Sequence, residues 1–308
     1  MITNLVTGGA GFIGSNLAKK LIKLNQKVIC IDNLSSGNLN NIKELLKSKN
    51  FVFVKHDILN SVEFKVDRIW HFACPASPHN YQNKPLETAK INFIGTLNML
   101  EIAKKYSSKF LFSSSSEIYG DPIDSPIEED SIIRLKTQSI RSCYSEGKRI
   151  AETLCFDYQR KFNLDIKVAR IFNTYGPNLS LTDGRIIGSF LDSIIENRPL
   201  TIFGNGKQTR SFCYIEDLLE GLILLMESDY KGPINFGFPK QTSIIGLGLI
   251  IEQLVKKKLQ YTYKEAKEDD PQIRLPSIKL ANEILGWKPK VDLNMGLKQT
   301  LISFTNRI

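Results

Sequence analysis

The sequence predicts an α/β fold in which a doubly wound parallel sheet is joined to a smaller, interleaved C-terminal lobe. Two observations lead to this prediction. Through about the first 110 residues, short apolar runs alternate with amphipathic stretches, and strands that alternate with helices are typical of a parallel sheet. After about Asn173 the loops lengthen and become rich in Gly, Pro, Asn and Thr, which indicates a less regular second lobe.

The individual elements follow from apolar periodicity. The expected strands are short apolar runs, at Asn4–Thr7, Lys27–Ile31, Phe51–Val54, Arg68–Phe72, Phe110–Ser113 and Ile166–Ile171. The expected helices have apolar residues at helical spacing, at Ile13–Leu24, Leu86–Tyr106, Ser142–Phe162, Ile186–Glu196, Ile215–Met226 and Lys279–Leu285.

The composition is that of a globular protein. The chain has 308 residues, 42% of them hydrophobic and 24% charged, which suffices for one large domain or two small ones. No apolar run reaches the roughly 18 residues of a membrane span, and Met1 to Thr7 read as a strand rather than as a targeting leader. We therefore expect a cytoplasmic protein without a membrane partner.

The formal charge of +9 is compatible with nucleic-acid binding or with a lysine-rich surface. The lysines are dispersed, and the run Lys256-Lys257-Lys258 ends a helical pattern, which favours a solvated face and no nucleic-acid partner. A basic surface would also attract a nucleotide diphosphate. The five cysteines are odd in number and lack CxxC spacing, which predicts reduced thiols and no metal site.

A glycine motif follows the first expected strand and opens the first expected helix. It is Gly8-Gly9-Ala10-Gly11-Phe12-Ile13-Gly14. Glycines permit a tight turn and close backbone approach, and the helix N-terminus offers free N–H groups to a pyrophosphate. The motif predicts a Rossmann-like dinucleotide site, with Gly8, Gly11, Phe12, Ile13 and Gly14 as cofactor-binding candidates.

The predicted cofactor is NAD. Asp32 ends the second expected strand, where a carboxylate accepts hydrogen bonds from the adenosine ribose and repels a 2′-phosphate. The loop from Asn33 to Asn41 contains no Arg or Lys, which disfavours NADP further. Asn33, Asp57 and Ile58 complete the candidates; Asp57 faces the adenine or merely caps a strand end. We predict an NAD-binding domain at 1–172 with a return segment near 208–230, and a substrate lobe at 173–207 and 231–308.

Tyr144 and Lys148 form a YxxxK motif within an expected helix, so the two side chains share one face. A nearby ammonium and an oxidised nicotinamide favour the phenolate form of Tyr144, which predicts a general base. Ser115, Ser116 and Glu117 follow the fifth expected strand. The carboxyl ends of parallel strands line the ligand crevice, so these residues are further catalytic candidates.

The chain resembles the extended short-chain dehydrogenases/reductases, and within them the UDP-glucuronate decarboxylases. The resemblance rests on segments spread through nearly the whole chain. They are His71 through Pro78, Ser116 through Pro122, Arg141 through Arg149, Arg170 through Pro177, Gln208 through Tyr214, and Asp269-Asp270-Pro271 with Arg274 and Pro276. The Ala-Cys-Pro-Ala-Ser-Pro and Arg-Ser-Phe-Cys-Tyr runs are specific to this branch, whereas the glycine and YxxxK motifs mark only the superfamily.

The resemblance implies a decarboxylation of UDP-glucuronate to UDP-xylose through a 4-keto sugar, with NAD regenerated. Tyr144 would take the 4-hydroxyl proton, Ser115 would help to stabilise the enolate, and Ser116 and Glu117 would lie beside C5. Arg274 would orient the sugar carboxylate. The other substrate contacts implied by the resemblance are Pro78, Tyr81, Asn173, Arg185, Arg210 and Tyr214, of which Tyr214 is the weaker candidate that could only pack.

Alternatives remain open at this stage. They are a UDP-sugar 4-epimerase, a 4,6-dehydratase, a decarboxylase that releases the 4-keto-pentose, and a non-catalytic NAD-binding regulatory protein. Dehydratases place Asp-Glu where this chain has Ser116-Glu117, and epimerases generally lack the acid at position 117. The chain departs from the decarboxylase pattern at Ile132–Ile140, Ser145 and Asn178. Relatives pair the helices matching Leu86–Tyr106 and Ser142–Phe162, so we expect a homodimer.

Overall fold

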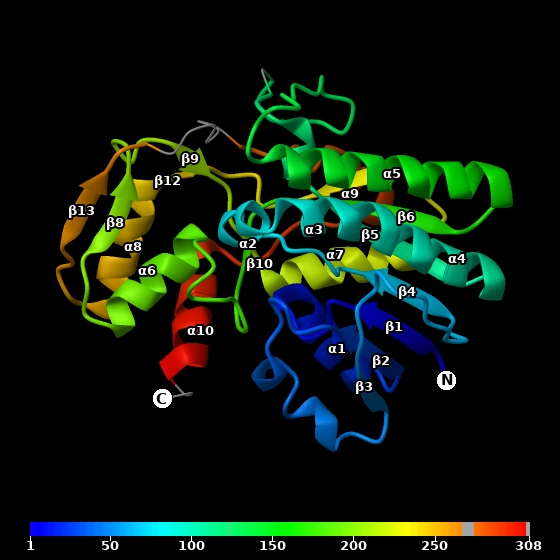
Figure 1. Cartoon of the computed structure of the whole chain (residues 1–308). Helices are drawn as coiled ribbons and strands as arrows, with labels where there is room; N and C mark the ends of the chain where they lie inside the picture. Colours follow the sequence, from blue (N-terminus) through cyan, green and yellow to red (C-terminus); the bar gives the residue numbers. More distant parts are fainter. Residues whose placement is uncertain (123, 267–273, 306–308) are drawn as a thin grey trace.

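The computed structural model describes residues 1–122, 124–266 and 274–305, and a seven-stranded parallel sheet forms its centre (Figure 1). The strand order is β11-β6-β5-β4-β1-β2-β3. These strands are β1 (Thr3–Thr7), β2 (Lys27–Asp32), β3 (Phe51–Lys55), β4 (Arg68–His71), β5 (Lys109–Ser115), β6 (Ile166–Ile171) and β11 (Pro233–Phe236). The predicted doubly wound α/β fold is confirmed.

Alternate side chains of each strand enter opposite faces of the sheet. In β1, Leu5 packs with the helices of one face and Val6 with those of the other, and both side chains are fully buried. A parallel sheet covered on both faces needs nearly continuous apolar strands. This requirement explains why β1 to β6 were recognisable in the sequence.

Helices cover both faces of the sheet (Figure 1). One face carries α1 (Phe12–Lys23), α7 (Ile215–Glu227) and α9 (Lys279–Leu285). The other face carries α3 (Pro85–Lys90), α4 (Thr96–Tyr106) and α5 (Ser142–Phe162), preceded by the short α2 (Pro78–Asn83). Short 3-10 turns lie at η1 (Leu39–Asn41), η2 (Leu45–Lys47) and η4 (Ser116–Tyr119).

The helix expected as one piece at Leu86–Tyr106 contains a π-helical turn, η3 (Ile91–Gly95), between α3 and α4. At Gly95, an added Cβ would lie 2.5 Å from the Cδ1 atom of Ile58. Such turns insert one residue into a helix and often lie at functional sites. Apolar periodicity does not distinguish this turn from a regular helix, and the interruption was not predicted.

The smaller lobe lies beyond the carboxyl ends of the strands, at the left of Figure 1. Its helices are α6 (Ile186–Ile195), α8 (Ile244–Val255) and α10 (Leu293–Thr305). Its strands form three pairs, which are β7 (Thr174–Tyr175) with β10 (Cys213–Tyr214), β8 (Leu200–Phe203) with β13 (Tyr261–Lys264), and β9 (Thr209–Arg210) with β12 (Thr242–Ser243).

Two features of this half differ from the sequence-based expectations. Strand β11 falls within the range 231–308 that was expected to be substrate lobe, yet it pairs with β6 as the edge strand of the main sheet. For α8, the sequence predicted only a helical pattern that ends at Lys256-Lys257-Lys258, without a starting residue, and α10 was not predicted. The α8 segment is apolar on most sides and carries Gly246 and Gly248, which makes its bounds hard to set from the sequence. The signal for α10 was Asp292, whose Oδ1 accepts a hydrogen bond from Met295 N at 2.8 Å, as an N-cap does.

Candidate active site

A cleft of about 1450 Å³ opens at the carboxyl ends of the strands, between the sheet and the smaller lobe. It lies where the strand order reverses, between β1 and β4, which is the usual ligand position in open α/β sheets. The cleft is lined by every predicted cofactor and catalytic residue, which are Gly8, Gly11, Phe12, Ile13, Gly14, Asp32, Asn33, Asp57, Ile58, Ser115, Ser116, Glu117, Tyr144, Lys148 and Arg274.

The β1–α1 turn depends on the absence of side chains at two glycines. Gly8 has φ of +65°, and an added Cβ would lie 2.9 Å from the Ala73 backbone. At Gly14 a Cβ would lie 2.3 Å from the Gly8 carbonyl oxygen. Gly11 precedes α1 as its N-cap without a side-chain cap. The first N–H groups of the helix are therefore available to an anion, as dinucleotide binding requires.

Asp32 ends β2 and is held by the backbone of the neighbouring turns. Its Oδ2 accepts a hydrogen bond from Ala10 N at 3.0 Å, and its Oδ1 accepts one from Leu34 N at 2.8 Å. Burial raises the pKa of this carboxyl, and the two backbone bonds oppose the rise. Each carboxylate oxygen keeps a second lone-pair direction for a ribose hydroxyl.

Asp57 interacts with its own loop as well as lining the cleft. Its Oδ2 accepts a hydrogen bond from Asn33 Nδ2 at 2.9 Å, and its Oδ1 accepts one from Leu59 N at 2.9 Å. The second contact is the strand-end cap considered in the sequence. Asp57 thus links the ends of β2 and β3 and still borders the cleft.

Tyr144, Ser115 and Lys148 converge in the cleft beside the carboxyl end of β5. The Ser115 side chain lies close enough to the Tyr144 hydroxyl to affect the pKa of that phenol. Lys148 Nζ donates to the carbonyl oxygen of Ser113 at 2.9 Å and lies 5.8 Å from the centroid of the Tyr144 ring. The i, i+4 spacing on α5 and the end of β5 bring these groups together, as predicted from the sequence.

The ionisation of this group is governed first by burial. Burial raises the pKa of Tyr144, although the hydrogen bond with Ser115 opposes the rise. Burial also lowers the pKa of Lys148. The chain's own groups therefore keep the phenol protonated, and the phenolate expected from the sequence depends on the positive charge of an oxidised nicotinamide.

A charged cluster lies beside Tyr144. Glu117, in η4 after β5, accepts hydrogen bonds from Arg141 Nη2 at 2.8 Å and from Arg141 Nε at 3.2 Å. It also accepts one from Arg274 Nη1. Burial alone would raise the pKa of Glu117, but the two guanidiniums outweigh burial and lower it to about 2. Glu117 is therefore ionised, with Ser116 buried next to it.

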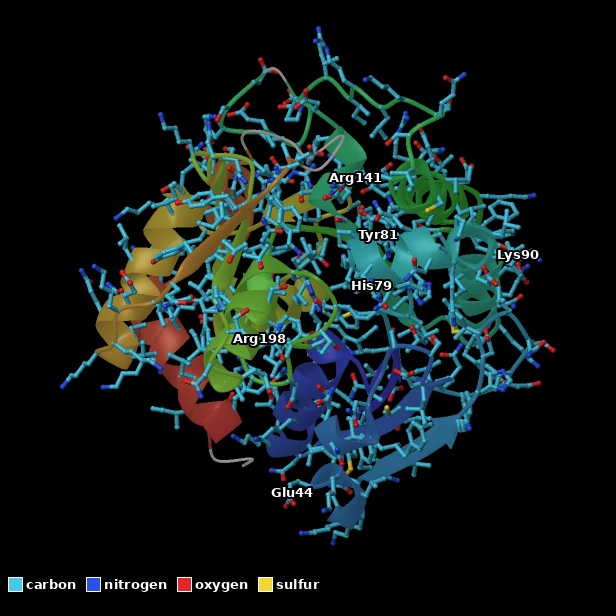
Figure 2. The ribbon with its side chains drawn as sticks, turned by 60° about the vertical axis from the view of Figure 1, so that its left-hand side comes forward. Glu44, His79, Tyr81, Lys90, Arg141 and Arg198 are labelled. Carbon is cyan, nitrogen blue, oxygen red and sulfur yellow. The ribbon has the colours of Figure 1, made fainter. Side chains whose placement is uncertain are left out.

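Tyr81 extends this cluster from α2. Its ring stacks on the Tyr144 ring, with centroids 4.9 Å apart and an interplanar angle of 9°. Its hydroxyl is buried and has no hydrogen-bond partner among residues 1–122, 124–266 and 274–305. Figure 2 shows Tyr81 and Arg141 on the same side of the cleft, with Arg198 on the smaller lobe. Pro78, at the start of α2, also lines the cleft.

Three further substrate candidates line the cleft, and one does not. Asn173 follows β6, Arg210 belongs to β9, and Arg185 precedes α6. Arg185 Nε donates to Asp183 Oδ2 at 2.8 Å, and its guanidinium lies 5.6 Å from the centroid of the Phe12 ring. Tyr214 instead packs edge-on against Tyr175 and is 2% exposed. The structure thus gives Tyr214 a packing position.

The departures from the decarboxylase pattern have local partners. Ser145 Oγ donates to the Arg141 carbonyl oxygen at 3.2 Å. Asn178 has φ of +69° and donates to Ser15 Oγ at 3.0 Å, and Asn tolerates this left-handed backbone. In the 132–140 stretch, Arg134 pairs with Gly120 through an isolated bridge. The segment Asp269-Asp270-Pro271 lies outside the described residues.

Sequence reasoning missed one residue of the charged cluster, Arg141. It was noticed only within the segment that carries the resemblance. The signal was its place three residues before Tyr144, at the N-terminus of α5. Its partner Glu117 lies 24 positions earlier, so no local pattern joins the two.

The residues present fit NAD. The Gly8–Gly14 turn leaves a cradle that a Cβ would fill. Asp32 ends β2, and Tyr144 and Lys148 line the same cleft beside β5, which β4 and β1 separate from β2. Among the described residues, no group of three or more His, Cys, Asp or Glu side chains could hold a metal ion. None of the described helices is long and apolar enough to cross a membrane.

Comparison with known proteins agrees with this geometry. A family model described as GDP-mannose 4,6 dehydratase matches residues 5–300. UDP-glucuronic acid decarboxylase 1 of Arabidopsis thaliana is 44% identical over 304 residues, covering 99% of this chain and 70% of that protein. UDP-glucuronic acid decarboxylase 6 of the same plant is 46% identical over 295 residues, covering 95% of this chain and 86% of that protein.

The fold of the chain is similar to that of a solved nucleotide-sugar enzyme. The crystal structure of UDP-glucuronic acid 4-epimerase from Bacillus cereus in complex with UDP-glucuronic acid and NAD has a TM-score of 0.89 and 28% identity, with 100% of each chain covered. The chain therefore belongs to the GDP-mannose 4,6-dehydratase family of extended short-chain dehydrogenases/reductases, together with the UDP-glucuronic acid decarboxylases.

Proposed function

We propose that this protein removes carbon dioxide from UDP-glucuronate to give UDP-xylose, with NAD reduced and reoxidised within each cycle. One observation carries the proposal: the buried Arg274 contacts Glu117 in the cleft, and its Nε has no hydrogen-bond partner among the described residues. A buried guanidinium with a spare donor is suited to a second carboxylate, and a uronate sugar brings one. The decarboxylase relatives, 44% and 46% identical, support this substrate.

The first stage is proton transfer at the sugar 4-hydroxyl. Tyr144 accepts the proton, and the Ser115 hydroxyl, which lies beside Tyr144, donates a hydrogen bond to the sugar oxygen. Lys148 holds a positive charge near both groups because Ser113 O fixes its ammonium. When bound, NAD supplies a reversible hydride acceptor for C4.

The second stage is the loss of the carboxylate. A ketone at C4 lies β to the carboxylate on C5, so the bond between C5 and the carboxylate can break with its electrons passing to O4. Tyr144 and Ser115 donate hydrogen bonds to the resulting enolate oxygen. Arg274 orients the carboxylate before it leaves, and Ser116 and Glu117 border C5, where a proton is added. Return of the hydride to C4 completes UDP-xylose without net oxidation.

The test is product analysis by mass spectrometry after incubation of purified protein with UDP-glucuronate and NAD. A UDP-pentose lighter than the substrate by one carbon dioxide supports the proposal. An isomer of unchanged mass would show a 4-epimerase, and loss of water from a UDP-hexose would show a dehydratase. A pentose lacking two further hydrogens would show release of the 4-keto sugar. Bound NAD without any turnover would favour a regulatory protein.

We also propose a division of labour along the chain. Residues 1–172 with the return near 208–230 would hold NAD, and 173–207 with 231–308 would hold the sugar nucleotide. The pairing of β11 with β6 assigns 233–236 to the first group instead. Exchange protection on addition of NAD alone, and then of UDP, would test this division.

A homodimer through α3, α4 and α5 is a further part of the proposal. Exposed apolar side chains lie on α3 (Leu86), on the intervening turn η3 (Phe93 and Ile94) and on α5 (Ile150), and such a face favours a partner. Sedimentation of the wild type and of Phe93→Glu tests it. A dimer that the variant converts to a monomer supports the proposal, and a monomeric wild type contradicts it.

We propose the cytoplasm as the compartment, because all five cysteines are free and unpaired thiols suit a reducing environment. Fractionation of cells that express the tagged protein tests this compartment. Recovery with membranes or in the medium would contradict it.

A further inference from the structure

Arg141 is the residue of the charged cluster that neither the resemblance nor the sequence patterns assign. Its guanidinium contacts both carboxylate oxygens of Glu117, with Nη2 at 2.8 Å from Oε1 and 2.8 Å from Oε2, and Nε at 3.2 Å from Oε2. Both side chains are largely buried, at 16% and 18% exposure. Such a two-pronged, partly desolvated pair is among the stronger ionic contacts in proteins.

The two arginines hold Glu117 differently. Within the part of the chain that the structure describes, Arg274 contacts Glu117 through Nη1 and Oε1, its Nη2 donates to the Gly120 carbonyl oxygen at 3.3 Å, and its Nε has no partner. Arg141 directs Nε and Nη2 at the same carboxylate. The Arg274 guanidinium therefore has an N–H donor left for another anion, whereas the Nε and Nη2 of Arg141 both donate to Glu117.

Arg141 is the N-cap residue of α5, the helix that carries Tyr144 and Lys148. Its carbonyl oxygen accepts hydrogen bonds from Tyr144 N at 3.0 Å and from Ser145 N at 3.1 Å. Its own N–H donates to Ser139 Oγ at 3.3 Å. The backbone turn that places the Tyr144 hydroxyl in the cleft thus also places the Arg141 guanidinium, so the position of Glu117 is coupled to that of Tyr144.

We propose that Arg141 is a positioning residue that keeps Glu117 ionised and oriented when Arg274 turns to the carboxylate of the sugar. This inference rests on the proposed decarboxylation. A uronate that enters the cleft competes with Glu117 for Arg274. With Arg141 present, Glu117 keeps a counter-charge and its orientation when that contact is lost. Without Arg141, Glu117 either keeps Arg274 bound, so that Arg274 cannot contact the substrate, or takes up a proton.

Both consequences are measurable. The charged or titratable groups that face Glu117 are Arg141 and Tyr144 from α5, Arg274 from the segment after 273, and Tyr81 from α2. The two arginines lower the pKa of Glu117, so removal of Arg141 raises it. The acidic limb of the kcat/KM profile then moves to higher pH. The KM for UDP-glucuronate rises by about 10- to 100-fold, the usual effect of losing a charged hydrogen-bond pair.

The experiment compares kcat, KM and their pH profiles for wild type, Arg141→Gln and Arg141→Lys. Lysine keeps the positive charge but cannot donate two parallel hydrogen bonds. Arg141→Lys should therefore have the wild-type acidic limb, with a KM between those of the wild type and Arg141→Gln. The matched control is Arg160→Gln, the same change on the same helix at an exposed pair with Asp157. The control should match the wild type. Carbon dioxide release by the wild type tests the proposed function separately from these variants.

A double-mutant cycle with Glu117→Gln separates positioning from general stability. If Arg141 acts through Glu117, adding Arg141→Gln to Glu117→Gln changes kcat/KM by less than about twofold, because the interaction is already gone. Multiplicative losses in the double variant would overturn the inference. An unshifted acidic limb and unchanged KM in folded Arg141→Gln would overturn it as well.

Discussion

The two ends of the cleft are built on different principles. The cofactor end is shaped mainly by the backbone. Gly8 and Gly14 allow a turn that a Cβ would block, and two main-chain N–H groups bind Asp32. The sugar end is held together by side chains, because Glu117 binds Arg141 and also Arg274, which lies 157 positions away in the chain. The first end is shaped by steric exclusion and the second by charge balance.

This difference indicates how each end should respond to change. A steric site fails when volume is added, and salt or pH affects it little. A charge-balanced site fails when one partner is removed, because the remaining buried charge loses its counter-ion. Tyr144 lies between the two ends, beside Ser115 and stacked on Tyr81.

The largest effect is expected at this junction. Tyr144→Phe removes the proton acceptor while keeping the stacked ring, so kcat should fall by about 10³- to 10⁴-fold, at the upper end for general base groups. NAD affinity should stay within a few-fold of the wild type. Stopped-flow absorbance of reduced nicotinamide and NAD titration measure the two quantities. Hydride transfer at the normal rate would remove Tyr144 from its role.

A smaller effect is expected at the charged end. Arg274→Ala should lower kcat/KM for UDP-glucuronate by about 100-fold, since a charged hydrogen bond to the carboxylate is lost. Binding of plain UDP serves as the internal control, because UDP has no carboxylate. Equal weakening of UDP and UDP-glucuronate binding would point to a general loss of structure instead.

At the steric end, Gly14→Ala should weaken NAD binding by about 10- to 100-fold, because overpacking of this kind costs about 1–3 kcal/mol. Its Cβ would lie 2.3 Å from the Gly8 carbonyl oxygen. The matched control is Gly286→Asn: Gly286 has φ of +61° with no atom within 4 Å of an added Cβ, and Asn accepts that backbone. Calorimetric titration with NAD measures both. Normal affinity in Gly14→Ala would contradict the steric account.

The sequence predicted the cofactor end of the cleft better than the sugar end. The glycine turn, Asp32 and the Tyr144–Lys148 pair lie within short stretches, where strand ends and helical spacing place side chains reliably. The contacts of Arg141 and Arg274 with Glu117 depend on packing between distant segments, so only the resemblance suggested Arg274. Tyr214 was the weaker substrate candidate, with packing as the stated alternative, and its ring packs on Tyr175.

Prediction of the fold was limited in the same way, because features that depend on contacts between distant segments were missed. Strands buried on both faces were recognisable from their apolar runs, and α5 and β6 begin and end as expected. The π-helical turn at Ile91–Gly95 has no distinct period in the sequence. The bounds of α8 were not predicted, because its segment is apolar on most sides. Strand β11 was missed because its membership of the main sheet depends on pairing with β6.

The smallest effect concerns acid stability. A carboxyl whose pKa is lowered by folding stabilises the fold above its unfolded pKa, and that stabilisation is lost as pH falls through the folded value. For Glu117 the window runs from 4.5 down to about 2. The free energy of unfolding of the wild type should therefore fall more steeply across this window than that of Glu117→Gln. Urea titrations at several pH values measure it, and parallel curves would contradict the charge-balanced site.

The most direct test of the account follows carboxyl-labelled UDP-glucuronate in one reaction with the wild-type protein and NAD, recording labelled carbon dioxide and the absorbance of reduced nicotinamide together. We expect one carbon dioxide for each substrate consumed, with no build-up of reduced nicotinamide beyond the enzyme concentration. Substrate consumption without labelled carbon dioxide would contradict the account, because the charged end of the cleft would then serve a different reaction.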